Sequence, residues 1–106
     1  MRIDEYKSLD AVGIASRVRT REVDPIEVTE AALAVIEEAN PVLNAVILLD
    51  PERAREEAAR VDRMAPLAGV PFLVKDNNQF VATWPTTYSS RFYEGVAPQP
   101  DSEFIT

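Results

Sequence analysis

Apolar side chains recur at the spacing of a helix face near the start of the chain. One apolar stripe occupies positions i, i+3, i+4 and i+7, namely Ala11, Ile14, Ala15 and Val18. Ser8 is a good N-cap residue just before this stripe, so we expect the first helix to begin near it. Its C-terminal end carries a basic run, Arg17, Arg19 and Arg21, which suits the negative end of a helix dipole.

The second helix carries the clearest start signal in the chain. Asp24 is a capping residue, Pro25 takes the first helical position, and Glu27 completes a capping-box pattern. Apolar residues cover one side of this helix and glutamates the other, and we interpret the glutamates as a solvated face. We expect the helix to end at Asn40, because a residue that precedes proline is pushed out of the helical region.

A third helix is predicted from about Pro51 to Met64. The pair Asp50-Pro51 repeats the signal of a cap followed by proline. Side chains of opposite charge then follow at i, i+4 spacing, which supports a solvent-facing helix, in the pairs Arg53–Glu57 and Glu56–Arg60.

Two short apolar runs predict strands on either side of this third helix. Asn44–Leu49 is rich in β-forming residues, and Pro71–Lys75 has three apolar residues before its lysine. Two strands joined through a helix make a parallel pair with a right-handed crossover. We therefore expect an α/β fold with helices packed on an incomplete mixed sheet. Such a pair leaves apolar surface and a sheet edge open, which predicts self-association.

Residues 77 to 100 hold neither a helical nor an alternating pattern, and a run of this length is usually functional or packed against another element. Asp101 to Thr106 then resembles the capped start of a fourth helix that stops after about one turn. We therefore expect residues 1–106 to be the N-terminal segment of a longer protein. Residues 1–64 would form a helical region with one strand, and residues 65–106 a lysine-bearing strand and an irregular loop.

The composition narrows the chemistry that the chain can perform. It has no histidine and no cysteine, which excludes Ser-His and Cys-His catalysis, disulfides and thiolate metal sites. Its acids are not spaced for a metal, and three glycines make no phosphate-binding loop, so we expect no metal and no cofactor. With 18 acids against 11 bases, the net charge of −7 argues against nucleic-acid binding by this segment. The groups that remain as candidates for catalysis are carboxylates, lysine and hydroxyl groups.

The apolar run Ala45–Leu49 is too short for a membrane span, and the N-terminus lacks the apolar run of a signal peptide. We expect a soluble, cytoplasmic protein with no membrane partner.

Lys75 is the sharpest candidate for catalysis. It follows three apolar residues at the end of a predicted strand and precedes Asp76. Burial would favour the neutral amine, which could then act as a general base. The alternative is a lysine that reaches solvent from a strand edge and pairs with Asp76.

Hydroxyl and aromatic side chains gather downstream of this lysine. The hydroxyls of Thr83, Thr86, Thr87, Ser89 and Ser90 either supply chemistry or make local turns and caps. A second set could line a pocket or cover a neighbouring element, and consists of Trp84, Tyr88, Phe92 and Tyr93.

Three segments carry a family resemblance. Residues 66–77, PLAGVPFLVKDN, resemble the P-L-x-G-V-P-x-x-V-K-D-N run of the amidase signature family. Residues 85–90, PTTYSS, resemble that family's P-T-T-x-G-S loop, and residues 27–45 resemble its N-terminal helix, turn and first strand. The resemblance thus covers roughly residues 20–106. The matching motif positions are Gly69, Pro71, Lys75, Asp76, Asn77, Thr86, Thr87 and Ser90.

The resemblance implies hydrolysis or transfer of small-molecule amides by a Ser–cis-Ser–Lys triad. Lys75 matches the triad lysine, whose neutral amine would accept a proton through a bridging serine and so activate the nucleophilic serine. Backbone N–H groups would stabilise the oxyanion. The family's two triad serines lie downstream of the segment matched here, and neither Ser89 nor Ser90 corresponds to them. This segment by itself should therefore be inactive.

One departure from the family pattern concerns the threonine loop. Ser89 stands where the family loop has glycine, and it would be strained if that position requires a positive φ.

Two other functions stay open at this point. The chain could be a catalytically inert interaction module on the same scaffold, using its open edge and aromatic residues. It could also belong to the transamidating branch of the family, which works as one subunit of a larger complex on aminoacylated transfer RNA.

Overall fold

The computed structural model describes residues 1–106 except Asn78, Ala97, Phe104 and Thr106. The chain divides into two compact units, Met1–Pro71 and Phe72–Thr106, and each is described by itself.

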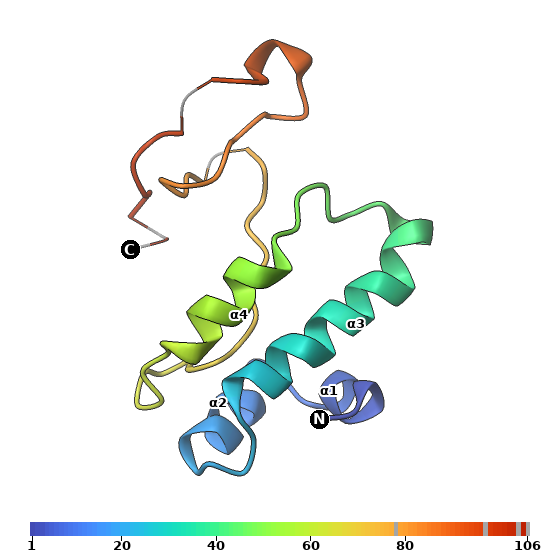
Figure 1. The fold of residues 1–106 in the computed structure, drawn as a ribbon, viewed down its shortest axis with the longest axis vertical. Helices are drawn as coiled ribbons and strands as arrows, with labels where there is room; N and C mark the ends of the chain where they lie inside the picture. Colours follow the sequence, from blue (N-terminus) through green and yellow to red (C-terminus); the bar gives the residue numbers. More distant parts are fainter. Residues whose placement is uncertain (78, 97, 104, 106) are drawn as a thin grey trace. The chain divides into compact units, whose positions relative to one another are not determined.

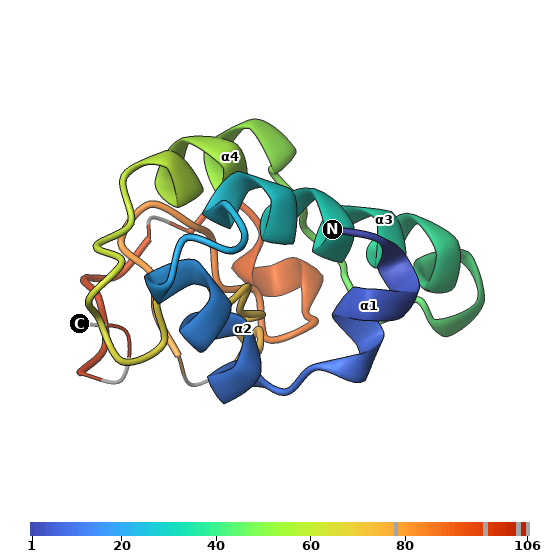
Figure 2. The same ribbon diagram turned by 90° about the horizontal axis from the view of Figure 1, so that it is seen from below.

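The first unit is built from helices. They are α1 (Ile3–Ser8), α2 (Ala11–Arg19), α3 (Pro25–Leu43) and α4 (Pro51–Ala59). The long helix α3 packs against α1 and against α4, which runs alongside it in both views (Figure 1 and Figure 2). Helix α3 is therefore the central support of this unit.

The core of the first unit lies where α2, the start of α3 and a later loop meet. Its buried members are Ile14, Val18, Val23, Val28 and Ala68. Val18 and Val28 are fully buried, and the stripe expected on the first helix does supply part of this core, because Ile14, Ala15 and Val18 are all buried. Residues 65–70 thus return to the helices in the form of a loop.

The start of α3 confirms the predicted capping box. The side chain of Asp24 accepts a hydrogen bond from the N–H of Ile26 at 2.9 Å, and Glu27 accepts one from the N–H of Asp24 at 2.9 Å. The predicted end at Asn40 was wrong, since α3 continues through Pro41 to Leu43 and ends with Asn44 in a left-handed conformation. Proline lacks an N–H and crowds the carbonyl four residues before it, so Pro41 costs α3 one hydrogen bond in its last turns without ending the helix.

Two other helix boundaries also differ from the expectation. Asp10, and not Ser8, caps α2 by accepting from the N–H of Gly13 at 2.7 Å, and Ser8 ends the unexpected helix α1. Helix α4 ends at Ala59 instead of Met64. Beyond it, the Asp62 side chain accepts from the N–H of Met64 at 2.9 Å, a local turn that competes with helix.

The predicted α/β fold was wrong for the part of the chain that the structure describes, which contains no strand and no sheet. Residues 44–50 and 71–75 run without regular structure, and their apolar side chains are largely exposed, as at Ile47 (62%) and Phe72 (65%). A strand is stabilised by pairing with a neighbour, and no described segment pairs with either run. The side chain of Asn40 binds both the N–H and the C=O of Val46, at 2.9 Å each, and so takes up backbone groups that a ladder would use.

The second unit is held by turns. Its one regular element among the described residues is a 3₁₀ turn, η1 (Arg91–Tyr93). Asp101 does not cap a helix here, because its side chain accepts from the N–H of Ala82 at 2.7 Å. The predicted fourth helix is absent from the described residues of 101–106, and its positions 104 and 106 lie outside them.

No helix in the described ranges is both long and apolar enough to cross a membrane.

Candidate functional site

Lys75 lies near the start of the second unit, on a turn and not on a strand. Its carbonyl oxygen accepts a hydrogen bond from the N–H of Asn77 at 2.9 Å, so the peptide folds tightly around Asp76. The side chain of Lys75 is exposed in this chain, which agrees with the alternative of a lysine that reaches solvent. The pairing with Asp76 that this alternative included is not seen among the described residues, because the Asp76 carboxylate binds Thr87.

Asp76 instead binds the threonine loop that the resemblance singled out. One carboxylate oxygen accepts from the N–H of Thr87 at 2.7 Å, and the other accepts from the hydroxyl of Thr87. We call this arrangement of Asp76 with residues 87–89 the Asp76 clamp. It brings together two motif positions that stand 11 residues apart in the chain.

The environment of Asp76 favours its charged form. Partial burial alone would raise the pKa of this carboxyl group. Hydrogen bonds from the side chain and backbone of Thr87 and from the backbone of Ser89 and Tyr88 outweigh that effect and hold the pKa below the ordinary aspartate value. The clamp is therefore a charged carboxylate surrounded by donors.

The loop bound by Asp76 has an unusual backbone. Tyr88 (φ 51°) and Ser89 (φ 56°) both adopt the left-handed conformation. Ser89 therefore does have the positive φ for which the family loop uses glycine. Each such residue costs on the order of 1 kcal/mol or more, and the hydrogen bonds to Asp76 offset this cost. Successive N–H groups in this type of turn form a concave anion site, and here the protein's own carboxylate fills it.

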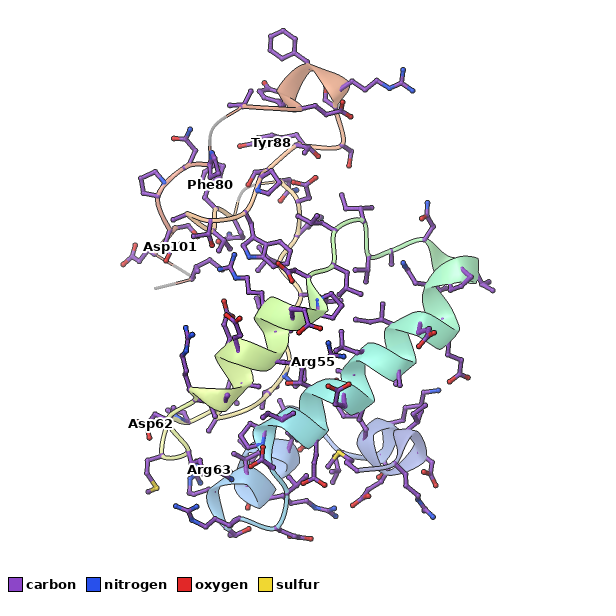
Figure 3. All side chains as sticks on the ribbon, viewed as in Figure 1. Arg55, Asp62, Arg63, Phe80, Tyr88 and Asp101 are labelled. Carbon is purple, nitrogen blue, oxygen red and sulfur yellow. The ribbon has the colours of Figure 1, made fainter. Side chains whose placement is uncertain are left out.

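Thr86 and Ser90, on either side of this loop, have different surroundings. Ser90 caps η1 by accepting from the N–H of Phe92 at 3.3 Å. Thr86 helps to line a hollow of about 270 Å³ in the second unit, together with Phe80, Tyr88, Tyr93, Val96, Pro98 and Gln99. The rings of Tyr88 and Tyr93 lie 5.1 Å apart, and those of Phe80 and Tyr88 lie 6.5 Å apart (Figure 3).

Only some of the residues that line this hollow were predicted from the sequence. The aromatic set was predicted either to line a pocket or to cover a neighbouring element. Tyr88 and Tyr93 do line the hollow, Trp84 and Phe92 are not among its lining residues, and Phe80 and Gln99 were missed. Phe80 could have been found by the same argument, since it too is an aromatic residue in the irregular stretch. Gln99 carries no signal in the sequence.

The remaining motif positions belong to the first unit. Gly69 has a φ of 70°, and a side chain there would meet Val18 at 3.0 Å and Pro25 at 3.3 Å. Pro71 is half-buried and ends this unit. These two residues therefore shape the chain before Lys75 and carry no chemistry of their own.

Charged side chains of the first unit form structural pairs. Arg55 on α4 binds Glu30 on α3 through two nitrogens, at 2.5 and 3.2 Å (Figure 3). Arg63 donates to the carbonyls of Val18 and Val23 and to the carboxylate of Asp24. Within the described ranges, no group of three or more acidic side chains is placed to hold a metal ion.

Comparison with known proteins identifies the family. The family model described as "Amidase" matches residues 27–106. The chain is 44% identical to a glutamyl-tRNA(Gln) amidotransferase subunit from Thermus thermophilus, over 80% of this chain and 18% of that protein. It is 34% identical to the subunit of the same name from Cutibacterium acnes, over 98% of this chain and 22% of that protein.

A relative with a different name is the acylamidase of Rhodococcus erythropolis, 32% identical over 89% of this chain and 20% of that protein. The chain thus spans about a fifth of the length of the curated relatives it matches. No solved structure matches it significantly. Since the family model covers three quarters of the chain and includes the lysine motif and the threonine loop, the chain belongs to the amidase family.

Proposed function

We propose that this chain is the N-terminal part of an amidase that is as long as its relatives. In this proposal the chain supplies the lysine of a Ser–cis-Ser–Lys site. The observation that carries the proposal is the run PLAGVPFLVKDN, which lies inside the family match and ends in Lys75-Asp76-Asn77. The matched relatives include an acylamidase, which supports a small-molecule amide as substrate.

The chemistry requires a neutral amine at Lys75. An exposed lysine is charged at neutral pH and cannot accept a proton, whereas desolvation favours the neutral form. Lys75 is exposed in the chain as described here. In our proposal the rest of the longer polypeptide covers Lys75 and brings the bridging and nucleophilic serines to it. The amine then takes the proton that leaves the bridging serine, which in turn deprotonates the nucleophile as it attacks the amide carbon.

The chain offers a matched control, because it contains only two lysines, Lys7 and Lys75. Lys7 is half exposed on α1 and pairs with Glu38 at 3.6 Å. The test measures the release of ammonia from acetamide, propionamide and benzamide by the longer polypeptide, which has the length of the relatives. Lys75→Ala and Lys75→Arg should each lower kcat by about a thousandfold or more, since arginine stays protonated, while Lys7→Ala leaves kcat unchanged. Substantial activity in Lys75→Ala would refute the role of Lys75.

The transamidating branch is a second candidate, favoured by the relatives named as amidotransferase subunits. In that case the protein would work as one subunit of a larger complex and transfer ammonia to glutamyl-tRNA. Both candidates use Lys75 in the same way, so Lys75→Ala does not separate them. Product analysis does: free carboxylic acid from small amides supports the hydrolase, and glutaminyl-tRNA formed only with partner subunits supports the transferase.

A third candidate, of a different class, is a binding module without catalysis. It rests on the exposed apolar side chains at Ile47, Phe72 and Leu73. Exposed apolar surface of this kind promotes association between copies of a chain. If this were the function, sedimentation would show a stable oligomer, Ile47→Asp would dissociate it, and Lys75→Ala would have no effect on any measured property.

A further inference from the structure

The Asp76 clamp connects the peptide that carries Lys75 to the threonine loop of the same unit. The carboxylate that binds Thr87 belongs to the residue directly after the lysine. The turn from the N–H of Asn77 to the carbonyl of Lys75, at 2.9 Å, further restricts the direction in which the lysine leaves the backbone. Asp76 and Lys75 are adjacent in the sequence, yet the Asp76 carboxylate binds the Thr87–Ser89 loop and does not pair with the Lys75 amine.

The partners of the carboxylate indicate a holding function. Both oxygens are engaged by Thr87, one by its N–H and one by its hydroxyl, and the backbone of Tyr88 and Ser89 adds to them. Two consecutive non-glycine residues with positive φ are kept in place at this point. Asparagine at position 76 would keep one acceptor oxygen in place of two, and alanine would keep none, so neither could bind the N–H and the hydroxyl of Thr87 through separate oxygens.

We propose that Asp76 is a positioning residue for Lys75, acting by locking the Lys75–Asn77 turn against the Thr87–Ser89 loop. The inference rests on the proposed function, because it concerns the lysine of that site. It also assigns the N–H of Thr87 to the carboxylate of Asp76, so this N–H does not serve the oxyanion of the reaction.

A second aspartate of the same unit provides the matched control. Asp101 also accepts a backbone hydrogen bond at 2.7 Å, from Ala82, and it too is a carboxylate that holds a loop. Its bond does not involve the peptide of Lys75. If alanine acted only by loosening the second unit, replacing Asp76 and replacing Asp101 should lower kcat equally. A positioning role should lower kcat only when Asp76 is replaced.

The test measures kcat and KM in the longer polypeptide, which has the length of the relatives, with p-nitroacetanilide as chromogenic amide; circular dichroism measures the folded fraction. Asp76→Ala should lower kcat by about 10- to 100-fold, the size expected when a catalytic group is misplaced by roughly 1 Å. KM should change by less than about threefold, because the clamp does not touch the substrate. Asp101→Ala should leave kcat unchanged, and the circular dichroism spectrum, which reports the folded fraction, should stay the same for both variants.

Two milder variants keep the proposal testable if Asp76→Ala fails to fold. Asp76→Asn retains one acceptor oxygen and should lose less activity than Asp76→Ala. Thr87→Ser keeps the hydroxyl and should resemble the parent, while Thr87→Val should lower kcat and spare KM.

The outcomes of these tests distinguish the positioning role of Asp76 from the proposed function of Lys75, on which that role rests. Full activity in Lys75→Ala overturns the proposed function itself. An inactive Lys75→Ala together with an unchanged kcat in Asp76→Ala, or an equal loss in Asp76→Ala and Asp101→Ala, overturns the positioning role alone. A loss of kcat in Asp76→Ala that is matched by an equal loss of folded fraction would also overturn it, because it would show fewer folded molecules and not slower ones.

Discussion

Gly69 offers the sharpest test of how the lysine motif is built into the first unit. Its backbone has a φ of 70°, and a Cβ at this position would lie 3.0 Å from Cγ2 and 3.4 Å from Cγ1 of Val18. It would also lie 3.3 Å from Cβ of Pro25. Both neighbours are buried, and Val18 has no exposed surface at all. Gly69→Ala therefore adds a methyl group where neither the backbone nor the packing accepts it.

The cost has two parts. An L-residue in the left-handed conformation loses about 1–2 kcal/mol relative to glycine. Forcing a methyl group into a packed core costs about 1–3 kcal/mol more. The sum, about 2–5 kcal/mol, is a large part of the roughly 4–10 kcal/mol expected for a unit that spans Met1–Pro71. Gly69→Ala should therefore bring the first unit close to unfolding.

Circular dichroism at 222 nm during urea unfolding is the suitable assay, because all described α-helices lie in the first unit. Fluorescence of Trp84 reports the second unit separately. Gly13→Ala makes the same chemical change on α2, where the helix favours alanine and the tight contact is with the Asp10 side chain at 3.1 Å. We expect Gly13→Ala to change the free energy of unfolding by less than about 1 kcal/mol.

A double variant separates the two parts of the cost. Val18→Ala removes both methyl groups that the new Cβ would meet, so its combination with Gly69→Ala should cost about 1–2 kcal/mol less than the sum of the single changes. A stability loss below about 1 kcal/mol in Gly69→Ala, or additive effects in the double variant, would refute the packing argument.

Further predictions concern the polar contacts of the two units. Arg63→Ala removes donors 3.1 Å from the carbonyl of Val18 and 2.7 Å from the carboxylate of Asp24, and should lower the free energy of unfolding by about 1.5–3 kcal/mol in urea titrations. Arg63→Lys should recover only part of this, because an ammonium group cannot reach both acceptors in the same geometry. The pKa of Asp76 is lowered in the folded chain, so the clamp contributes stability above the unfolded aspartate value of about 3.9 and loses it as the pH falls through the lower folded value. The amide resonance of Thr87 should therefore stay constant from neutral pH to about pH 4 and shift only below it, and a midpoint at or above about 4 would contradict this.

The helices were the most predictable part of the fold. The start of α3 was correct to the residue, because Asp24, Pro25 and Glu27 act on N–H groups within three positions of themselves. The end of the same helix was wrong, since the restriction that Pro41 places on Asn40 was outweighed by the bonds of Asn40 to Val46. Helix α1 was missed because its six residues, with no buried side chain, carry no apolar stripe.

The candidate site, like the helices, could be predicted from the sequence only in part. Its residues could be named from the motif around Lys75 and the loop around Thr87. Their connection through Asp76 could not, because nothing in the sequence says which of several nearby hydroxyls a carboxylate will bind. The sequence left open whether Lys75 would be buried or would reach solvent, because burial depends on contacts with other segments; in this chain its side chain is exposed.

The amino-acid sequence alone determined where α3 and α4 begin and which residues belong to the amidase motif. Both properties depend on neighbours a few positions away. The tertiary structure decided that residues 44–50 and 71–75 are not strands, and that Asp76 holds the loop of Thr87 while the side chain of Lys75 stays exposed. A helix satisfies its backbone hydrogen bonds within itself, whereas a strand, a clamp or a buried amine depends on partners that only the folded chain brings near.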